Sequence, residues 1–277
     1  MQRPIIVIFI MTSSEYVGRA RDGVQLGYTL HGDPAGANRI VLVHSLAMDR
    51  SFWRAVAERL GSAAVLTHDC RGHGRSDKPS GPATLEHHAD DLADLMDDLG
   101  WRDAIVAGAS MGGCIALAFA IRHPRRLSAL GLIDTTAWYG ADAPKNWQQR
   151  ANAARTEGLA SLIDFQLTRW FGAKFREENP QIVRESVEIF LRNDVEAYAE
   201  TCLMLGACDL RAGLPAIKVP TAIVVGEEDY ATPPAMAEAM HKAIAGSTLT
   251  VLAGARHLTP LERPDEITAA LEKLAGA

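Results

Sequence analysis

A serine with the surroundings of a nucleophile lies in the segment Gly108-Ala109-Ser110-Met111-Gly112, which fits the pattern G-x-S-x-G. An apolar, strand-like run (104–107) precedes Ser110, and a helical pattern (111–123) follows it. A serine held in a sharp turn between a strand and a helix needs small neighbours, and its hydroxyl stands exposed at the helix N-terminus. We therefore interpret Ser110 as a nucleophile. The alternative is a glycine-rich helix start of the kind that binds phosphates or dinucleotides.

A serine hydroxyl is a poor nucleophile until a general base removes its proton, so a histidine is expected downstream. His257 is the candidate, because it follows the strand-like run 248–252 and precedes the last predicted helix, at Pro264. The alternative for His257 is a solvated loop histidine.

A carboxylate must fix the tautomer of that histidine, and Asp229 lies in the loop after the strand-like run 221–225. Glu227 and Glu228 are competing acids, which we interpret as a solvated turn. Loops at the carboxyl ends of parallel strands gather on one edge of a sheet. Asp229 and His257 are therefore expected to meet Ser110 in space.

Acyl transfer also needs two N–H donors for the developing oxyanion. The backbone N–H of Met111 is the first candidate, since it follows the nucleophile at the positive end of a helix dipole. The second donor is expected in the loop His44-Ser45-Leu46, where we choose Leu46. We interpret His44 as a structural residue that packs or hydrogen-bonds beneath this loop.

Strands and helices that alternate along the chain must position these residues. Uninterrupted apolar runs are typical of strands covered on both faces, so they predict an α/β fold with a mostly parallel, doubly wound sheet. An alternating run (24–30) predicts an antiparallel edge strand of a hairpin. The predicted parallel strands are 40–44, 64–68, 104–107, 130–133, 221–225 and 248–252, and the clearest helices are 51–60, 84–99 and 111–123.

The alternation stops over residues 137–212, where helical patterns replace it. A long structureless insertion is uncommon in a compact domain, so we interpret this stretch as a helical cap inserted before the strand that leads to Asp229. The alternative is a separate small domain, although no Pro, Gly or Ser-rich linker marks its edges. The core is then 12–136 and 213–277, and residues 1–11 form an N-terminal extension, with Met11 as a possible natural start.

Composition excludes several classes of partner. The formal charge of −6 and the lack of a cluster of Lys and Arg argue against nucleic-acid binding. The apolar run 4–11 is too short to span a bilayer, so no membrane association is expected. The four cysteines form no C-x-x-C pair, which indicates free thiols and a cytoplasmic location.

Taken together, these stretches resemble the α/β-hydrolase superfamily over nearly the whole chain after Met11. The segment Asp69 to Ser76 resembles the D-x-R-G-x-G-x-S turn of that superfamily, and Gly226 to Pro233 resembles its acid loop. The order Ser, Asp, His also fits. The resemblance implies the α/β-hydrolase fold and catalysis without a metal or an organic cofactor.

Within the superfamily, four shorter motifs are most similar to 3-oxoadipate enol-lactonases. They are 44–46 followed by Asp49, the serine turn 110–113, the segment 169–171 and the segment 255–258. This resemblance implies that the serine opens a lactone and forms an acyl-enzyme, which water then hydrolyses. It also implies that Leu46 and Met111 supply the oxyanion donors.

We therefore expect a serine hydrolase that cleaves a small ester or lactone, and 3-oxoadipate enol-lactone is the substrate that the resemblance implies. Trp138 and Arg169 are candidate substrate-binding residues, Arg169 through a substrate carboxylate. The alternatives are cap packing for Trp138 and a surface or ion-paired position for Arg169.

Other functions fit the same triad. They include a general carboxylesterase, a carbon–carbon bond hydrolase of ring-fission products, a cofactor-free perhydrolase and a non-catalytic small-molecule receptor. A dehalogenase would need an aspartate where the chain has Ser110. In each reading the partner is a small molecule, and the sequence does not define the oligomeric state.

Overall fold

The computed structural model describes residues 14–33, 36–61 and 63–276; the proposed N-terminal extension 1–11 lies outside them. Within these ranges the strands form an eight-stranded sheet in the order β1-β2-β4-β3-β5-β6-β7-β8. The strands from β4 to β8 in that order pair in parallel, whereas β1 with β2 and β2 with β4 pair antiparallel. The expected mostly parallel sheet with flanking helices is confirmed.

The elements agree closely with the hydrophobic runs of the sequence. The strands are β1 (Ser14–Arg19), β2 (Gln25–His31), β3 (Arg39–Val43), β4 (Ala64–His68), β5 (Ala104–Ala109), β6 (Leu127–Ile133), β7 (Thr221–Gly226) and β8 (Thr248–Leu252). The helices of the sheet region are α1 (Arg54–Arg59), α2 (Leu85–Asp98), α3 (Met111–Arg122), α9 (Pro234–Ala243), α10 (Thr259–Glu262) and α11 (Pro264–Ala275). Between β6 and β7 lie α4 (Ala143–Glu157), α5 (Ile163–Trp170), α6 (Ala173–Glu178), α7 (Pro180–Leu191) and α8 (Val195–Gly206).

Burial along the strands explains two differences from the predicted sheet. Every residue of β4, β5 and β7 is buried, as expected for strands covered on both faces. By contrast, β8 is an edge strand, and Val251 on it is 45% exposed. The antiparallel hairpin is present, but the edge position of its 24–30 strand is wrong, because β1 pairs outside β2. The mixed sequence of β1 carries no alternating pattern that would reveal it.

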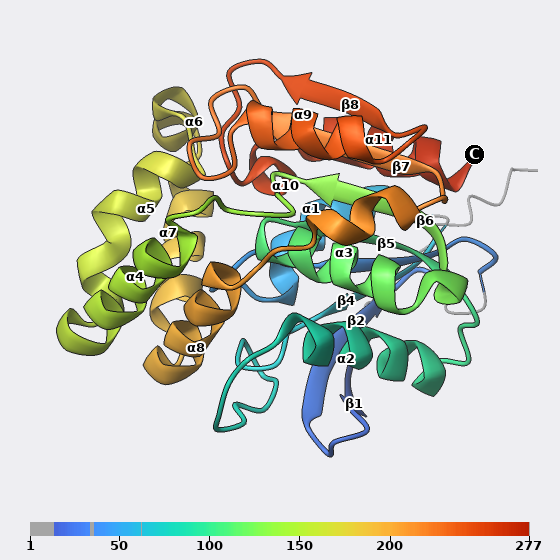
Figure 1. Cartoon of the computed structure of the whole chain (residues 1–277), viewed down its shortest axis with the longest axis horizontal. Helices are drawn as coiled ribbons and strands as arrows, with labels where there is room; N and C mark the ends of the chain where they lie inside the picture. Colours follow the sequence, from blue (N-terminus) through green and yellow to red (C-terminus); the bar gives the residue numbers. More distant parts are fainter. Residues whose placement is uncertain (1–13, 34–35, 62, 277) are drawn as a thin grey trace, which may run out of the picture.

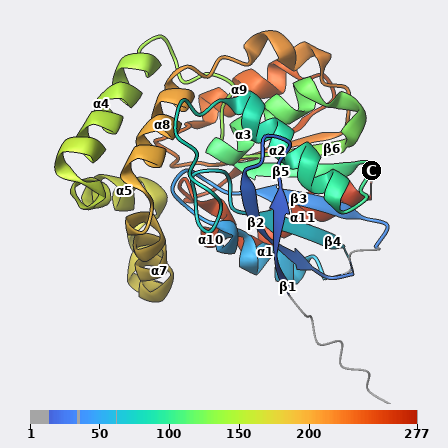
Figure 2. The ribbon, with the colours of Figure 1, turned by 90° about the horizontal axis from the view of Figure 1, so that it is seen from below.

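The sheet is the middle layer of the molecule. Figure 2 shows α2, α3 and α9 over one face and α1 and α11 over the other. Both views place the α4–α8 segment (143–206) beyond one end of the sheet, beside the loops that follow the parallel strands (Figure 1). A single cluster of buried apolar side chains extends from the sheet into this segment. The α4–α8 segment lies within residues 137–212, the interval in which the sequence predicts a cap.

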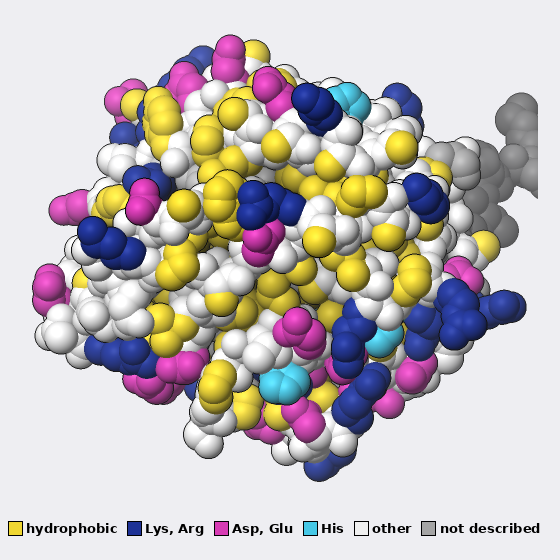
Figure 3. All heavy atoms as spheres, in the orientation of Figure 1, with side chains coloured by type: hydrophobic (Ala, Val, Ile, Leu, Met, Phe, Trp, Pro, Cys, Tyr) yellow, Lys and Arg dark blue, Asp and Glu magenta, His cyan; other side chains and the backbone are white. Residues whose placement is uncertain are grey.

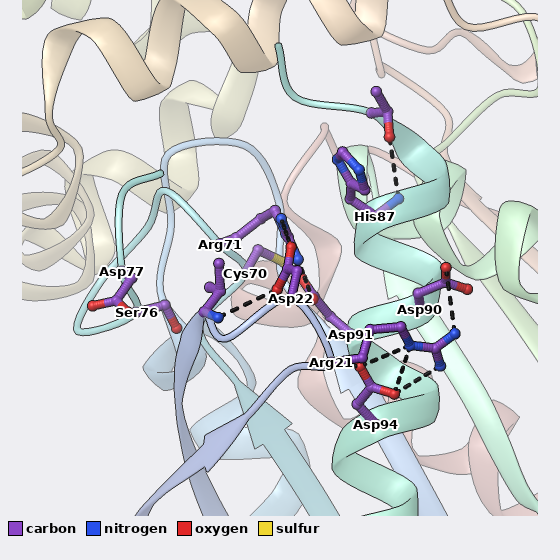
Figure 4. Close-up of polar contacts among 12 residues, drawn as sticks. Arg21, Asp22, Cys70, Arg71, Ser76, Asp77, His87, Asp90, Asp91 and Asp94 are labelled. Carbon is purple, nitrogen blue, oxygen red and sulfur yellow. Dashed lines mark hydrogen bonds and ion pairs between the residues drawn. The ribbon is translucent and has the colours of Figure 1, made fainter. Parts of the chain in front are cut away.

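Polar contacts fix the β1–β2 hairpin to helix α2 (Figure 4). Arg21, in the hairpin turn, donates from Nη2 to Asp94 Oδ1 at 2.7 Å. Arg71, in the loop after β4, pairs with the buried carboxylate of Asp91 at 2.5 Å and with Asp22 at 3.0 Å. One buried guanidinium thus ties the hairpin, the loop after β4 and α2 together.

The surface and the helices give two further observations. On the face shown in Figure 3, hydrophobic side chains gather over the middle, and charged side chains of both signs lie mostly around the margin. No helix within the described residues is long and apolar enough to cross a membrane.

Candidate active site

Ser110 occupies a strained turn between β5 and α3. Its backbone has φ 54° and ψ −117°, outside the regions that L-residues usually adopt. A Cβ at position 108 would lie 2.0 Å from the carbonyl oxygen of Gly112, and one at position 112 would lie 2.1 Å from that of Val43. Both flanking positions therefore require glycine. The turn is fixed further by the Ser110 N–H, which donates to the carbonyl of Ile133 at 2.9 Å.

The structure brings Ser110, His257 and Asp229 together in one hydrogen-bonded chain. His257 Nε2 lies 2.9 Å from Ser110 Oγ, and His257 Nδ1 lies 2.8 Å from Asp229 Oδ2. All three residues are buried. Since the carboxylate only accepts, Nδ1 carries the proton, and Nε2 is free to accept from the serine hydroxyl. This is the arrangement in which a histidine acts as a general base toward serine.

Asp229 is held by donors on both carboxylate oxygens. Its Oδ1 accepts from the backbone N–H groups of Ala231 and Thr232 at 2.8 and 2.9 Å, and its Oδ2 accepts from Thr232 Oγ1 at 2.8 Å. Burial alone would raise the pKa of this carboxyl, but its pairing with His257 and the hydrogen bonds from Thr232 outweigh burial and hold the pKa below its usual value. Asp229 therefore stays ionised.

The two competing acids point to other partners. Glu227 is exposed and accepts from the backbone N–H of Gly254 at 2.9 Å. Glu228 is half-buried and pairs with Arg256 at 3.3 Å. The acid loop thus presents Asp229 alone of the three to His257.

A second buried carboxylate, Asp134, joins the two loops that carry the acid and the base. It follows β6 with a φ of 45°. Its Oδ1 accepts from the Gly226 N–H at 3.0 Å, and its Oδ2 accepts from the N–H and hydroxyl of Thr259 at 3.0 and 2.6 Å. Burial and the charge of Asp229 raise its pKa well above the usual value. Sequence reasoning missed Asp134, although it directly follows the strand-like run 130–133.

The two proposed oxyanion donors lie on neighbouring elements. Met111 is the first residue of α3, and Leu46 is in the loop after β3. Neither backbone N–H has a protein acceptor in the part of the chain that the structure describes. Ala47 takes a φ of 59° in this loop, and its carbonyl accepts from Asn193 Nδ2 at 2.8 Å, a contact from the α7–α8 turn. Both N–H groups are therefore available to a substrate oxygen.

His44 lies fully buried beneath the Leu46 loop, as the sequence predicts. Its Nε2 accepts from the Cys70 N–H at 2.9 Å, so the proton is on Nδ1, which donates to the Ser45 carbonyl at 2.8 Å. The rings of His68 and His73 pack around it, with centroids 6.5 and 5.1 Å away. His44 therefore supports the loop from below and does not reach the cavity.

A cavity of about 560 Å³ opens onto Ser110 and His257. The sheet region contributes the loop after β3, the nucleophile and the base, whereas the opposite wall comes largely from the α4–α8 segment. The described residues that line it are Ser45, Leu46, Ser110, Tyr139, Ala143, Asn146, Trp147, Gln149, Arg150, Leu162, Phe165, Gln166, Arg169, Trp170, Ala231, Thr232, Met236 and His257.

The two predicted substrate-binding residues differ in position. Arg169 lines the cavity, with its guanidinium 4.0 Å from the ring centroid of Phe165 and Nη1 3.4 Å from the Tyr230 carbonyl. Trp138 does not line it; its ring lies against the Arg211 guanidinium, 3.8 Å from the centroid. The prediction for Trp138 is wrong, because its ring packs against Arg211, which follows α8, and is not part of the cavity wall.

Among the described residues, no group of three or more His, Cys, Asp and Glu side chains has the arrangement of a metal site. The chemistry available at the cavity is that of the hydroxyl, the imidazole and the backbone donors.

The chain is similar to known hydrolases over most of its length. Residues 38–264 match the family model described as alpha/beta hydrolase fold. The chain is 32% identical to 3-oxoadipate enol-lactonase 1 of Acinetobacter baylyi, over 89% of this chain and 91% of that protein. The structure of the enol-lactonase from Burkholderia xenovorans LB400 is 36% identical, with a TM-score of 0.90 over 95% of this chain and all 100% of that one.

A thermophilic esterase from Thermogutta terrifontis, solved with malate bound, is 31% identical, with a TM-score of 0.86 over 95% of this chain and 97% of that one. These likenesses agree with the sheet order, the strained serine turn and the order of the triad residues along the sequence. The chain belongs to the α/β-hydrolase fold family.

Proposed function

We propose that the protein is a serine hydrolase that cleaves a small lactone or ester through an acyl-enzyme. The hydrogen-bonded chain from Ser110 through His257 to Asp229, at the wall of a cavity, is the observation that carries this proposal. We also propose that the α4–α8 segment acts as a cap that limits access of water to the acyl site.

In the first half of the reaction, Ser110 Oγ attacks the substrate carbonyl carbon while its proton passes to His257 Nε2. The resulting oxyanion accepts from the N–H groups of Leu46 and Met111. When the tetrahedral intermediate collapses, the ring C–O bond breaks and His257 returns the proton to the leaving oxygen. In a lactone this leaving group stays attached to the acyl group.

In the second half, a water molecule loses its proton to His257 Nε2 and attacks the acyl carbon. Collapse of the second tetrahedral intermediate breaks the bond to Ser110 Oγ, which recovers the proton from His257. The product is a hydroxy acid, or a keto acid when the leaving oxygen belongs to an enol. Asp229 stabilises the imidazolium in both halves because it stays ionised.

The substrate proposed first is 3-oxoadipate enol-lactone. A relative named 3-oxoadipate enol-lactonase 1 is 32% identical over most of the chain, and the enol-lactonase from Burkholderia xenovorans LB400 is 36% identical. This substrate carries a free carboxylate, and Arg169 is a cation on the cavity wall that supports its binding. The second candidate is a carboxylesterase, which the similarity to the Thermogutta enzyme favours.

A substrate panel tests the proposal. Purified protein is assayed with 3-oxoadipate enol-lactone, simple p-nitrophenyl esters and a ring-fission diketone, with Ser110→Ala as the background. We expect the highest kcat/KM for the lactone, and a loss of several powers of ten in the variant. Undiminished turnover by Ser110→Ala would disprove the nucleophile, and a preference for simple esters would select the carboxylesterase.

The four cysteines support the proposed cytoplasmic location. All are buried free thiols, as expected for a protein that works in a reducing compartment.

A further inference from the structure

The cavity beside Ser110 carries an excess of positive charge. Two arginines, Arg150 and Arg169, are among the described residues that line it, and no aspartate or glutamate is. Burial is the main cause that lowers the pKa of Arg169, and the charge of the nearby Arg150 lowers it further. A small cavity with two cations and no anion in its wall is suited to a negatively charged ligand.

Arg150 is the more tightly positioned of the two cations. It lies on α4, and its Nε donates to the hydroxyl of Tyr198 on α8 at 2.6 Å. Its Cζ lies 5.0 Å from the ring centroid of Trp147 and 5.7 Å from that of Tyr198. Two aromatic rings and one hydrogen bond thus fix the guanidinium plane before any ligand arrives.

The terminal nitrogens of Arg150 have no protein acceptor, and no carboxylate pairs with them, within the described residues. Arg155, farther along the same helix, shows the contrast. It pairs with both Glu196 and Glu200 of α8. A half-buried guanidinium without a counter-charge is unfavourable unless a ligand supplies one, because water solvates it incompletely.

We propose that Arg150 is a specificity-determining residue that binds a free carboxylate on the substrate, so that the enzyme selects anionic lactones and esters. The proposal rests on the proposed function, because the carboxylate must belong to the molecule whose carbonyl Ser110 attacks. The two terminal nitrogens of a guanidinium match the two oxygens of a carboxylate. Tyr198 acts as a positioning residue, since it occupies Nε and leaves those nitrogens to the ligand.

Arg169 has a different part in this site. Its guanidinium lies against the Phe165 ring and its Nη1 contacts a backbone carbonyl, so some of its donors are already used. It adds positive charge to the cavity, whereas Arg150 supplies the unoccupied, preorganised donors. Sequence reasoning selected Arg169 and passed over Arg150, because Tyr198 becomes its neighbour only when α4 packs on α8.

Two p-nitrophenyl esters of equal acyl length test the proposal. One is the monoester of glutaric acid, which ends in a carboxylate, and the other is the pentanoate, which ends in a methyl group. The quantity measured is the ratio of kcat/KM for the anionic ester to that for the neutral ester. In Arg150→Met we expect this ratio to fall about 10- to 150-fold, since a hydrogen bond to a charged group contributes about 1.5–3 kcal/mol.

Arg155→Met is the matched control, because it also removes a contact between α4 and α8 but does not line the cavity. Its ratio should stay within about twofold of the wild-type ratio. Arg150→Lys keeps the charge and should recover part of the preference. An unchanged ratio in Arg150→Met, whether both kcat/KM values stay the same or fall equally, would overturn the proposal and leave Arg150 a structural residue.

Binding separates this proposal from the proposed function. Calorimetry of glutarate with the folded wild-type protein should show binding that weakens about tenfold or more in Arg150→Met and not in Arg155→Met. If the wild type hydrolyses neither ester but this pattern holds, the acyl-transfer proposal fails while the carboxylate site stands. If glutarate binds both variants equally, the carboxylate site fails even in an active hydrolase.

Discussion

Replacing Asp229 by asparagine should reverse the tautomer of His257, because the surroundings of Asp229 dictate how the new amide must lie. In the wild type, Oδ1 accepts from the N–H groups of Ala231 and Thr232, and Oδ2 accepts from His257 Nδ1. In Asp229→Asn, the amide oxygen must keep the two N–H donors. Its NH2 group then faces Nδ1 of the imidazole, which has to become an acceptor.

The magnitude follows from the number of donors involved. Turning the amide the other way would leave two buried N–H groups against an NH2 group, at about 1–3 kcal/mol each, so the amide orientation is fixed by roughly 2–6 kcal/mol. With Nδ1 accepting, the imidazole proton moves to Nε2, the atom that should accept from Ser110. Triad aspartate-to-asparagine changes with this outcome lower kcat by about 10⁴-fold in a serine protease. The same loss, about 5.5 kcal/mol, is expected here.

Initial rates and nitrogen NMR together test this reasoning. The rate with the preferred lactone or ester should fall about 10⁴-fold, and ¹⁵N shifts of His257 should place the proton on Nε2. Glu228→Gln, on the same loop, is the control and should change kcat less than about twofold, since Glu228 pairs with Arg256 and not with His257. A variant within tenfold of wild-type kcat, or one that keeps the proton on Nδ1, would refute the assigned role.

Two further predictions concern buried groups. Burial, with the neighbouring histidines, lowers the pKa of His68 and His73 to about 3, so the unfolded chain binds more protons between about pH 6.5 and 3. Unfolding free energy from urea titrations should therefore fall with decreasing pH in that window, by up to about 2.7 kcal/mol per pH unit from this pair, and a flat profile down to pH 5 would contradict it. In Asp134→Asn, the amide has a single accepting oxygen and cannot accept from both Gly226 and Thr259, so we expect kcat to fall about tenfold or more. An unchanged kcat in a folded variant would show that the hydrogen bonds of Asp134 to these two loops do not position the triad.

Much of the sheet and the triad could be predicted because each depends on local patterns. The run 64–68 begins with three apolar residues, and β4 has these limits, with every residue buried because both of its faces are covered. Ser110 could be placed because two glycines and a strand-to-helix change surround it. Since parallel strands end at one edge of the sheet, the meeting of Asp229 and His257 with Ser110 followed from topology.

The features that could not be predicted depend on contacts between distant segments. Asp134 reads as one acid among many until the Gly226 and Thr259 loops converge on it. Arg150 could not be selected from sequence, because Tyr198 contacts it from another helix and the lack of an acidic partner is a property of the packed cavity. Trp138 was misplaced for the same reason, since Arg211, the partner of its ring, lies far along the chain, after α8.

The bond from Asn193 to the Ala47 carbonyl has a consequence for how this enzyme can diversify. Asn193 belongs to the turn between α7 and α8, whereas Ala47 follows the proposed donor Leu46. This hydrogen bond therefore couples the position of the α4–α8 segment to that of the loop after β3. Exchanging that turn for one of another length would tilt the loop as well as reshape the entrance. Variants selected for new substrates at this turn will therefore change turnover together with affinity, whereas substitutions on α4 can alter affinity alone.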